Sequence, residues 1–113
     1  MKIIITTTEE NINSQVDERF GRAPYFFVAE VEGEEIKNYE FISNIGQTAS
    51  HGAGTGASQK VANLKAEVLI TSKLGPKASD VLSQVDIKIY SFVGTIKEAI
   101  KALAENNLEE IKI

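Results

Sequence analysis

The chain has 113 residues, of which 42% are hydrophobic and 25% are charged, and it contains no cysteine. This composition predicts one globular domain over residues 1–113 and excludes disulfides, thiolate metal sites and cysteine nucleophiles. A formal net charge of −4 argues against broad binding to nucleic acids or anionic membranes, because both require a basic surface. The amino terminus has only three consecutive isoleucines, too short an apolar run for a signal peptide or a membrane span, so we expect a cytoplasmic protein.

The first half of the chain predicts three strands. Residues 2–7 form an apolar, β-branched run without alternation, which is typical of a central strand covered on both faces. The polar residues 9–18 predict a loop, and residues 25–31 and 36–42 predict a β-hairpin around a turn at 32–34. Alternation in the second hairpin strand places Lys37, Tyr39 and Phe41 on one side, opposite Ile36, Asn38, Glu40 and Ile42.

The second half alternates helices with strands. Residues 43–56 are rich in Ser, Gly, Thr and Asn and predict a loop, and Ala57, Val61 and Leu64 then follow the spacing of one helical face. A strand at 67–71, a helix opened by Gly75-Pro76, a strand at 86–90 and a helix capped by Thr95 complete the chain. The second helix is expected to bury four side chains, Ala78, Val81, Leu82 and Val85. Together these elements predict an α/β fold, a mixed sheet of about five strands with three helices.

Glycines beside basic side chains mark a candidate site for a small anion. Bare backbone and positive charge let an anion approach closely, and ligands of open α/β sheets bind beyond the carboxyl ends of parallel strands. We expect the loops at 19–23, 51–56 and 73–77 to meet there. The candidate cofactor-binding residues are Arg19, Gly21, Arg22, His51, Gly52, Gly54, Gly56, Lys73, Gly75 and Lys77.

Each of these residues also has an ordinary structural interpretation. His51 is the only histidine; it is either a metal ligand or a loop residue without a ligand. The glycines at 52–56 either bind an anion at a helix start or form a flexible turn. The arginines either contact the ligand or pair with Asp17, Glu18 or the acidic hairpin, and the lysines are either ligand contacts or surface residues. The aromatic residues Phe20, Tyr25, Phe26 and Phe27 are expected in the core.

Three motifs in chain order carry a family resemblance. They are Phe20-Gly21-Arg22-Ala23, Gly52-Ala53-Gly54 and Gly75-Pro76-Lys77-Ala78. With them the chain resembles the dinitrogenase iron-molybdenum cofactor-binding domain family, as a stand-alone prokaryotic member. The resemblance implies a ribonuclease H-like fold and non-catalytic binding or carriage of an anionic metallocluster, such as an iron-molybdenum-cofactor-like, metal–sulfur or oxyanion cofactor. It also suggests a protein partner that receives the cofactor from a monomer or weak homodimer.

Two other function classes remain open. A small regulatory or interaction domain could bind a phosphate, a nucleotide or a protein partner through the same loops. An undescribed hydrolase is the third hypothesis, but no catalytic constellation is visible. The run at 2–8 carries no carboxylates for a two-metal nuclease, and no nucleophile elbow accompanies His51. We therefore expect a protein that is not an enzyme.

Overall fold

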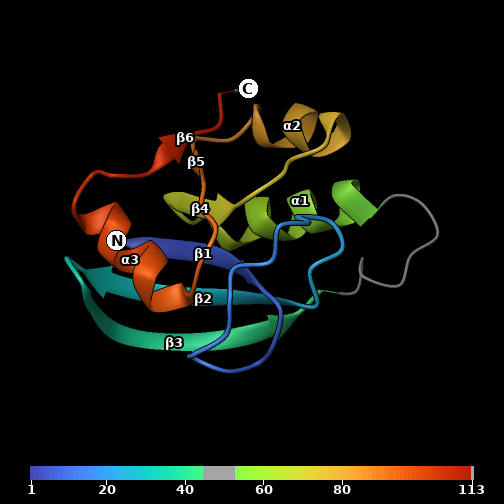
Figure 1. The fold of residues 1–113 in the computed structure, drawn as a ribbon. Helices are drawn as coiled ribbons and strands as arrows, with labels where there is room; N and C mark the ends of the chain where they lie inside the picture. The colour runs from blue at the N-terminus through green and yellow to red at the C-terminus, as the bar shows by residue number, and fades with distance from the viewer. Residues whose placement is uncertain (45–52, 113) are drawn as a thin grey trace.

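The structure, a computed structural model, describes residues 1–44 and 53–112, and within them it contains six strands and three helices (Figure 1). In chain order the elements are β1 Lys2–Thr7, β2 Tyr25–Glu32, β3 Glu35–Ser43, α1 Ala53–Leu64, β4 Val68–Thr71, α2 Pro76–Leu82, β5 Lys88–Ser91, α3 Ile96–Ala104 and β6 Glu109–Glu110. The strands form one mixed sheet in the order β3-β2-β1-β4-β5-β6. The predicted mixed α/β architecture is confirmed, and the ribonuclease H-like classification stays a prediction.

β1 is the central strand, as its unbroken apolar run predicted. It pairs antiparallel with β2 and parallel with β4, and β4 pairs parallel with β5. Ile3, Ile4 and Ile5 are all fully buried, because both faces of the sheet are covered by helices. Among the described residues, no helix is both long and apolar enough to cross a membrane.

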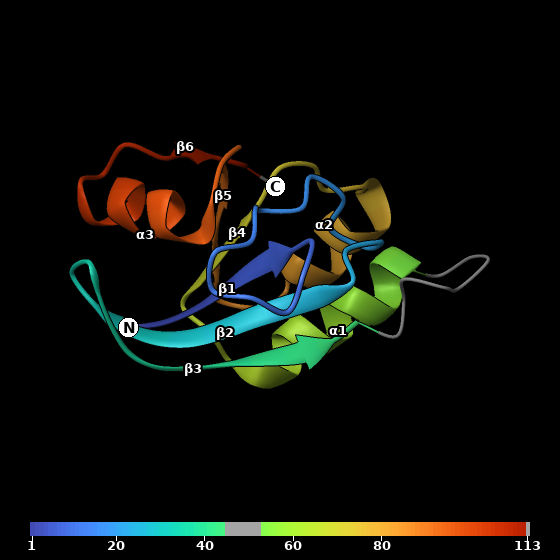
Figure 2. The ribbon, with the colours of Figure 1, turned by 60° about the horizontal axis from the view of Figure 1, so that its bottom comes forward.

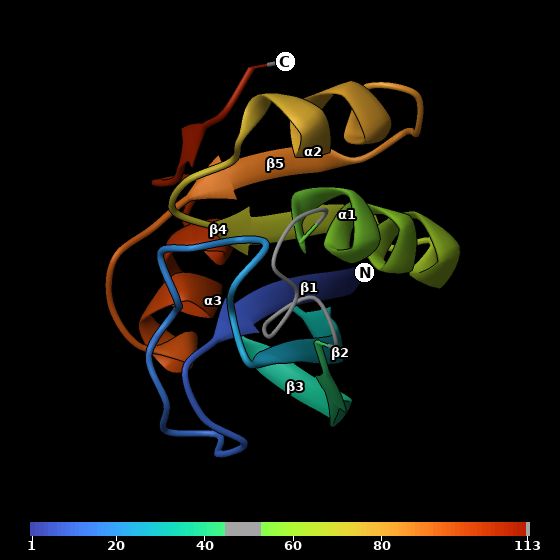
Figure 3. The ribbon, with the colours of Figure 1, turned by 90° about the vertical axis from the view of Figure 1, so that its right-hand side faces the viewer.

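The helices lie on opposite faces of the sheet, α3 on one and α1 with α2 on the other (Figures 2 and 3). Alternate residues of β1 serve the two cores: Ile3 and Ile5 belong to the cluster of α3, and Ile4 belongs to the cluster of α1 and α2. This is a three-layer arrangement, and loops follow the carboxyl ends of β1 and β4.

The start of α3 confirms the cap predicted at Thr95, which forms a capping box with Glu98. The Thr95 hydroxyl accepts a hydrogen bond from the Glu98 N–H at 3.2 Å, and the Thr95 N–H donates to the Glu98 carboxylate at 2.9 Å. This donation from the Thr95 backbone is the main reason why the pKa of Glu98 is lowered. Gly94 has a φ of +149°, and a Cβ there would lie 2.7 Å from the Phe92 ring, so glycine is required at this position.

Four predicted features of the fold are wrong in detail. The described residues contain six strands rather than about five. The short β6 was not predicted because its two glutamates form no apolar run. The helix α1 begins at Ala53, so residues 53–56 are helical and not part of the loop. The helix α2 ends at Leu82, which leaves Val81 half-buried and Val85 37% exposed.

The fourth error concerns the face of Ile36. The pairing of β2 with β3 shifts after Glu30, so that Asn38 pairs with Glu30 and Ile36 pairs with Val31. Lys37 is therefore the extra residue of a β-bulge, and it breaks the alternation. As a result Ile36 packs with Phe41 on the α3 side instead of sharing a side with Ile42.

Candidate functional site

Two of the predicted loops meet at the carboxyl ends of β1 and β4. The Lys73 N–H donates to the Glu18 carbonyl at 2.9 Å, the Phe20 N–H donates to the Lys73 carbonyl at 3.4 Å, and Arg19 and Lys73 form a parallel β-bridge. Figures 1 and 3 both show the loop before β2 beside the loop that joins β4 to α2. The structure thus brings the 19–23 and 73–77 segments together, as predicted.

Phe20 fixes this junction between the two helices of one face. Its side chain is 2% exposed and belongs to the same buried cluster as Ala57 of α1 and Ala78 of α2. Its ring centroid lies 6.2 Å from that of Phe26. The expectation that Phe20 is a core residue is confirmed, and burial of this one ring holds the turn that follows it beside the first turns of α1 and α2.

A buried polar network anchors the loop before β2 to the ends of β1 and β4. The Thr6 hydroxyl at the end of β1 lies 2.9 Å from both the Asp17 carbonyl oxygen and the Thr71 hydroxyl at the end of β4. The Asp17 N–H donates to the Thr6 carbonyl at 2.7 Å. All three side chains are at least nine-tenths buried, so each bond forms away from water. Sequence reasoning missed this network, and the Thr residues at the two strand ends were its only local signal.

The carboxylate of Asp17 holds Arg19 in place. Its Oδ1 accepts from the Arg19 backbone N–H at 2.8 Å and from Nε at 3.3 Å, and its Oδ2 accepts from a terminal guanidinium nitrogen at 3.2 Å. The side chain of Asp17 is 3% exposed and that of Arg19 is 60% exposed. The hydrogen bond to Asp17 raises the pKa of Arg19. The ion-pair interpretation is therefore confirmed for Arg19, and its contact with a ligand stays a prediction.

Asn44 clamps the turn from the other side, and sequence reasoning did not select it. It directly follows β3, is 5% exposed, and donates from its side-chain amide to the carbonyls of Ala23 at 2.8 Å and Gly21 at 3.2 Å. Its backbone N–H donates to the Pro24 carbonyl at 2.9 Å. The only signal in the sequence is an amide residue at the end of a strand, where the composition changes to a loop.

The described site glycines Gly56 and Gly75 are not required by the conformation of the backbone. Positive φ angles among the described glycines occur at Gly33 and Gly94, neither of them in the predicted site. Gly75 caps α2 with a φ of −76°, and a Cβ built at Gly75 or at Gly56 meets no atom within 4 Å. These two glycines therefore leave the backbone uncovered without a positive φ, and their contact with an anion stays a prediction.

The remaining predicted residues fall in different places. Gly54 is the second residue of α1, Arg22 is half-buried, and Lys73 and Lys77 are exposed. His51 and Gly52 lie outside the described residues. Within residues 1–44 and 53–112, no three His, Cys, Asp or Glu side chains gather as a metal site. The two segments that meet at this end carry Arg19, Arg22, Lys73 and Lys77, and guanidinium and ammonium groups are donors that suit an anion.

A model of the dinitrogenase iron-molybdenum cofactor family matches residues 1–106. The chain belongs to this family. An uncharacterized protein of Methanocaldococcus jannaschii is 37% identical over 101 residues, which cover 88% of this chain and 86% of that protein. The family assignment based on the three sequence motifs is therefore confirmed.

Two solved structures share both the fold and part of the sequence. The apo form of the orange protein from Desulfovibrio gigas superposes with a TM-score of 0.87 and 32% identity, covering 97% of this chain and 92% of that one. A candidate NifB protein from Thermotoga superposes with a TM-score of 0.80 and 34% identity, covering 96% and 91% of the two chains. The dinitrogenase iron-molybdenum cofactor family thus accounts for nearly the whole length of the fold.

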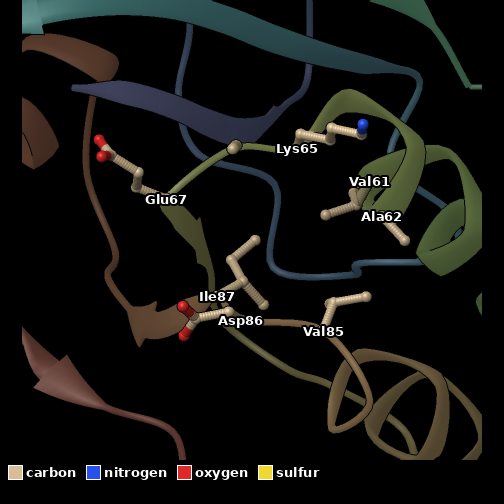
Figure 4. Close-up of a pocket in the computed structure, with 8 residues that line it drawn as sticks. Val61, Ala62, Lys65, Glu67, Val85, Asp86 and Ile87 are labelled. Carbon is tan, nitrogen blue, oxygen red and sulfur yellow. The ribbon is translucent and has the colours of Figure 1, made fainter.

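A pocket at the opposite end of this family member has a different character. It has a volume of 370 Å³ and lies between the end of α1 and the segment after α2 (Figure 4). Its apolar floor includes Val61 and Ile87, and the carboxylates of Glu67 and Asp86 lie on one side of it (Figure 4). With Lys65 as the one cation among its lining residues, the pocket has a net negative lining that disfavours an anion, so the cation-bearing end remains the candidate site.

Proposed function

We propose that this chain binds and carries an anionic metallocluster, an iron-molybdenum-cofactor-like or related metal–sulfur or oxyanion cofactor, without catalysing a reaction on it. The observation that supports the proposal best is the backbone pairing of the Arg19 and Lys73 segments. It places two cation-bearing loops side by side at the carboxyl end of the sheet, where ligands of open α/β folds bind. Membership of the dinitrogenase iron-molybdenum cofactor family supports the class of cargo.

The residues would hold such a cargo through charge and hydrogen bonds. Arg19 is fixed by Asp17 and remains 60% exposed, so its guanidinium is oriented before the ligand arrives. Backbone N–H groups at the start of α1 add donors without a side chain. The uncovered backbone at Gly56 and Gly75 lets a bulky anion come close. From the sequence, we propose His51 as a metal ligand, although it lies outside the described residues.

As a carrier, the chain would take up its cargo and pass it on to another protein. The cargo would leave for a protein partner, and the carrier itself would be a monomer or a weak homodimer. A chain without cysteine offers no thiolate to fix a cluster covalently, so binding through charge keeps the cargo transferable. The alternative is a regulatory domain that binds phosphate or a nucleotide with the same cations.

A titration with three anions tests the proposal against this alternative. Tetrathiomolybdate, molybdate and inorganic phosphate are added to the purified protein, and binding is followed by absorption and by thermal shift. Lys73→Glu reverses a charge beside the site, and Lys88→Glu makes the same change at the start of β5, at the opposite end. We expect tetrathiomolybdate to bind best and only Lys73→Glu to weaken it. Preference for phosphate favours the alternative, and equal loss in both variants contradicts the placement of the site.

A further inference from the structure

Asn44 makes bonds that tie the Gly21–Ala23 turn to the end of β3. The last residue pair of β2 and β3 is Tyr25 with Ser43, and the Asn44 N–H extends this ladder by donating to the Pro24 carbonyl at 2.9 Å. The side-chain amide nitrogen then donates to Ala23 and Gly21, at 2.8 and 3.2 Å. Asn44 thereby donates to three carbonyls, those of Gly21, Ala23 and Pro24, in the segment that carries Arg22.

The chemistry of this contact restricts the side chain that can make it. Two carbonyl oxygens require two donors from a single short side chain, and the primary amide of asparagine provides both on one nitrogen. A carboxylate of the same shape has acceptors only and would face these oxygens with negative charge. Because Asn44 is 5% exposed, water cannot easily replace the lost donors.

The other side of Asn44 faces α1. With Ser43 it lines a cavity of 230 Å³, whose opposite wall includes Gly56 and Lys60 of α1. Asn44 therefore holds the turn and also lines a cavity beside α1.

We infer that Asn44 is a positioning residue for the anion site, an inference that rests on the proposed function. It contacts the turn rather than the ligand, and it holds the turn that carries Arg22 in place before binding. A site ordered in advance loses less free energy on binding than one that must be assembled around its ligand. Loss of the clamp should therefore lower affinity without removing any group that touches the ligand.

Asn44→Asp tests this inference, because it keeps the shape of the side chain and removes both donors. The first measurement is the carbonyl ¹³C shift of Gly21 and Ala23 by NMR in the ligand-free protein. The second is the Kd for tetrathiomolybdate, measured at a temperature where every variant is folded. Asn38→Asp adds the same charge at an exposed position on β3, and Ile100→Val loosens the core of the opposite face. Asn44→Ala serves as a second variant if Asn44→Asp does not fold.

The expected result is a change in both carbonyl shifts and an affinity about tenfold lower for Asn44→Asp, with neither effect in the two controls. Unchanged carbonyl shifts would overturn the clamp itself. If the carbonyl shifts change but Asn44→Asp binds tetrathiomolybdate as tightly as Asn38→Asp does, the positioning role is overturned and Asn44 is a structural residue. If the wild-type protein binds no tetrathiomolybdate, the proposed function fails and the positioning role with it, while the carbonyl shifts still decide whether the clamp exists.

Discussion

Replacing Gly56 with alanine should make the protein more stable and a poorer binder. Gly56 is an exposed residue inside α1, and a Cβ built on it meets nothing within 4 Å. Alanine in a helix interior is favoured over glycine by up to about 1 kcal/mol, so we expect a gain of about 0.5–1 kcal/mol near the helix start. The unfolding entropy typical of 113 residues converts this gain into a rise in Tm of about 2–4 °C.

The expected loss of binding follows from the same bare surface. If the backbone at Gly56 is kept uncovered so that an anion can approach it, a methyl group there pushes the ligand away. Loss of about 1.4 kcal/mol of contact energy corresponds to a tenfold higher Kd. Thermal unfolding and a tetrathiomolybdate titration on the same preparations measure the two effects.

A stabilising control separates obstruction from rigidity. Asn106 follows α3 with a φ of +58°, a conformation that glycine adopts more easily, so Asn106→Gly should stabilise the protein without touching the site. Gly56→Ala should therefore bind more weakly than Asn106→Gly at similar stability. A Gly56→Ala protein that is more stable and binds like wild type would refute the role given to the bare backbone. A Gly56→Ala protein that is less stable than wild type would contradict the finding that a Cβ at this position meets no other atom.

Three further predictions follow from the charged groups. The double variant Arg19→Ala with Arg22→Ala should raise the Kd for the anionic probe several-fold and flatten its salt dependence. Loss of Arg19 leaves the buried Asp17 carboxylate without its cation, so adding Asp17→Asn should restore stability but not binding. His51→Ala should remove most of the fall in cofactor loading that we expect as the pH drops through about 6.5, and an unchanged pH profile would leave His51 an ordinary loop residue. For Glu98 the pKa is lowered in the fold, so its stabilisation is present above its ordinary value of 4.5 and is lost as the pH falls through the folded value. Glu98→Gln should thus lower Tm at pH 7 and match wild type once the pH is low enough to protonate the Glu98 carboxylate in the folded protein; a pH-independent difference would contradict the capping role.

Local patterns were enough to predict most of the sheet. The three consecutive isoleucines of β1 have no polar residue between them, a pattern typical of a strand that is covered on both faces. Thr95 and Glu98 carry their capping box within four residues of sequence, so it could be predicted without a partner element. The bulge at Lys37 could not be predicted, because the register of a strand is set by the strand it pairs with.

The candidate site was only partly predictable, because its supports are long-range. Thr6 and Thr71 lie 65 residues apart in the chain, and Asp17 joins them through its backbone, which no spacing rule reports. Asn44 acts on a turn more than 20 residues earlier. The glycines were predicted as site residues for their bare backbone, and a Cβ built at Gly56 or Gly75 meets nothing within 4 Å, although neither has a positive φ. Sequence thus indicated where the site lies, and packing decides which residues hold it.

The most direct test of the central claim is the metal content of the protein itself. The chain is purified without oxygen from cells supplied with iron, molybdenum and sulfide, and elemental analysis is combined with an absorption spectrum. We predict that metal and acid-labile sulfide copurify with the wild-type protein, give charge-transfer bands, and fall sharply in the Lys73→Glu variant but not in Lys88→Glu. A colourless wild-type protein without metal, stabilised instead by phosphate alone, would contradict the claim that the chain carries a metallocluster.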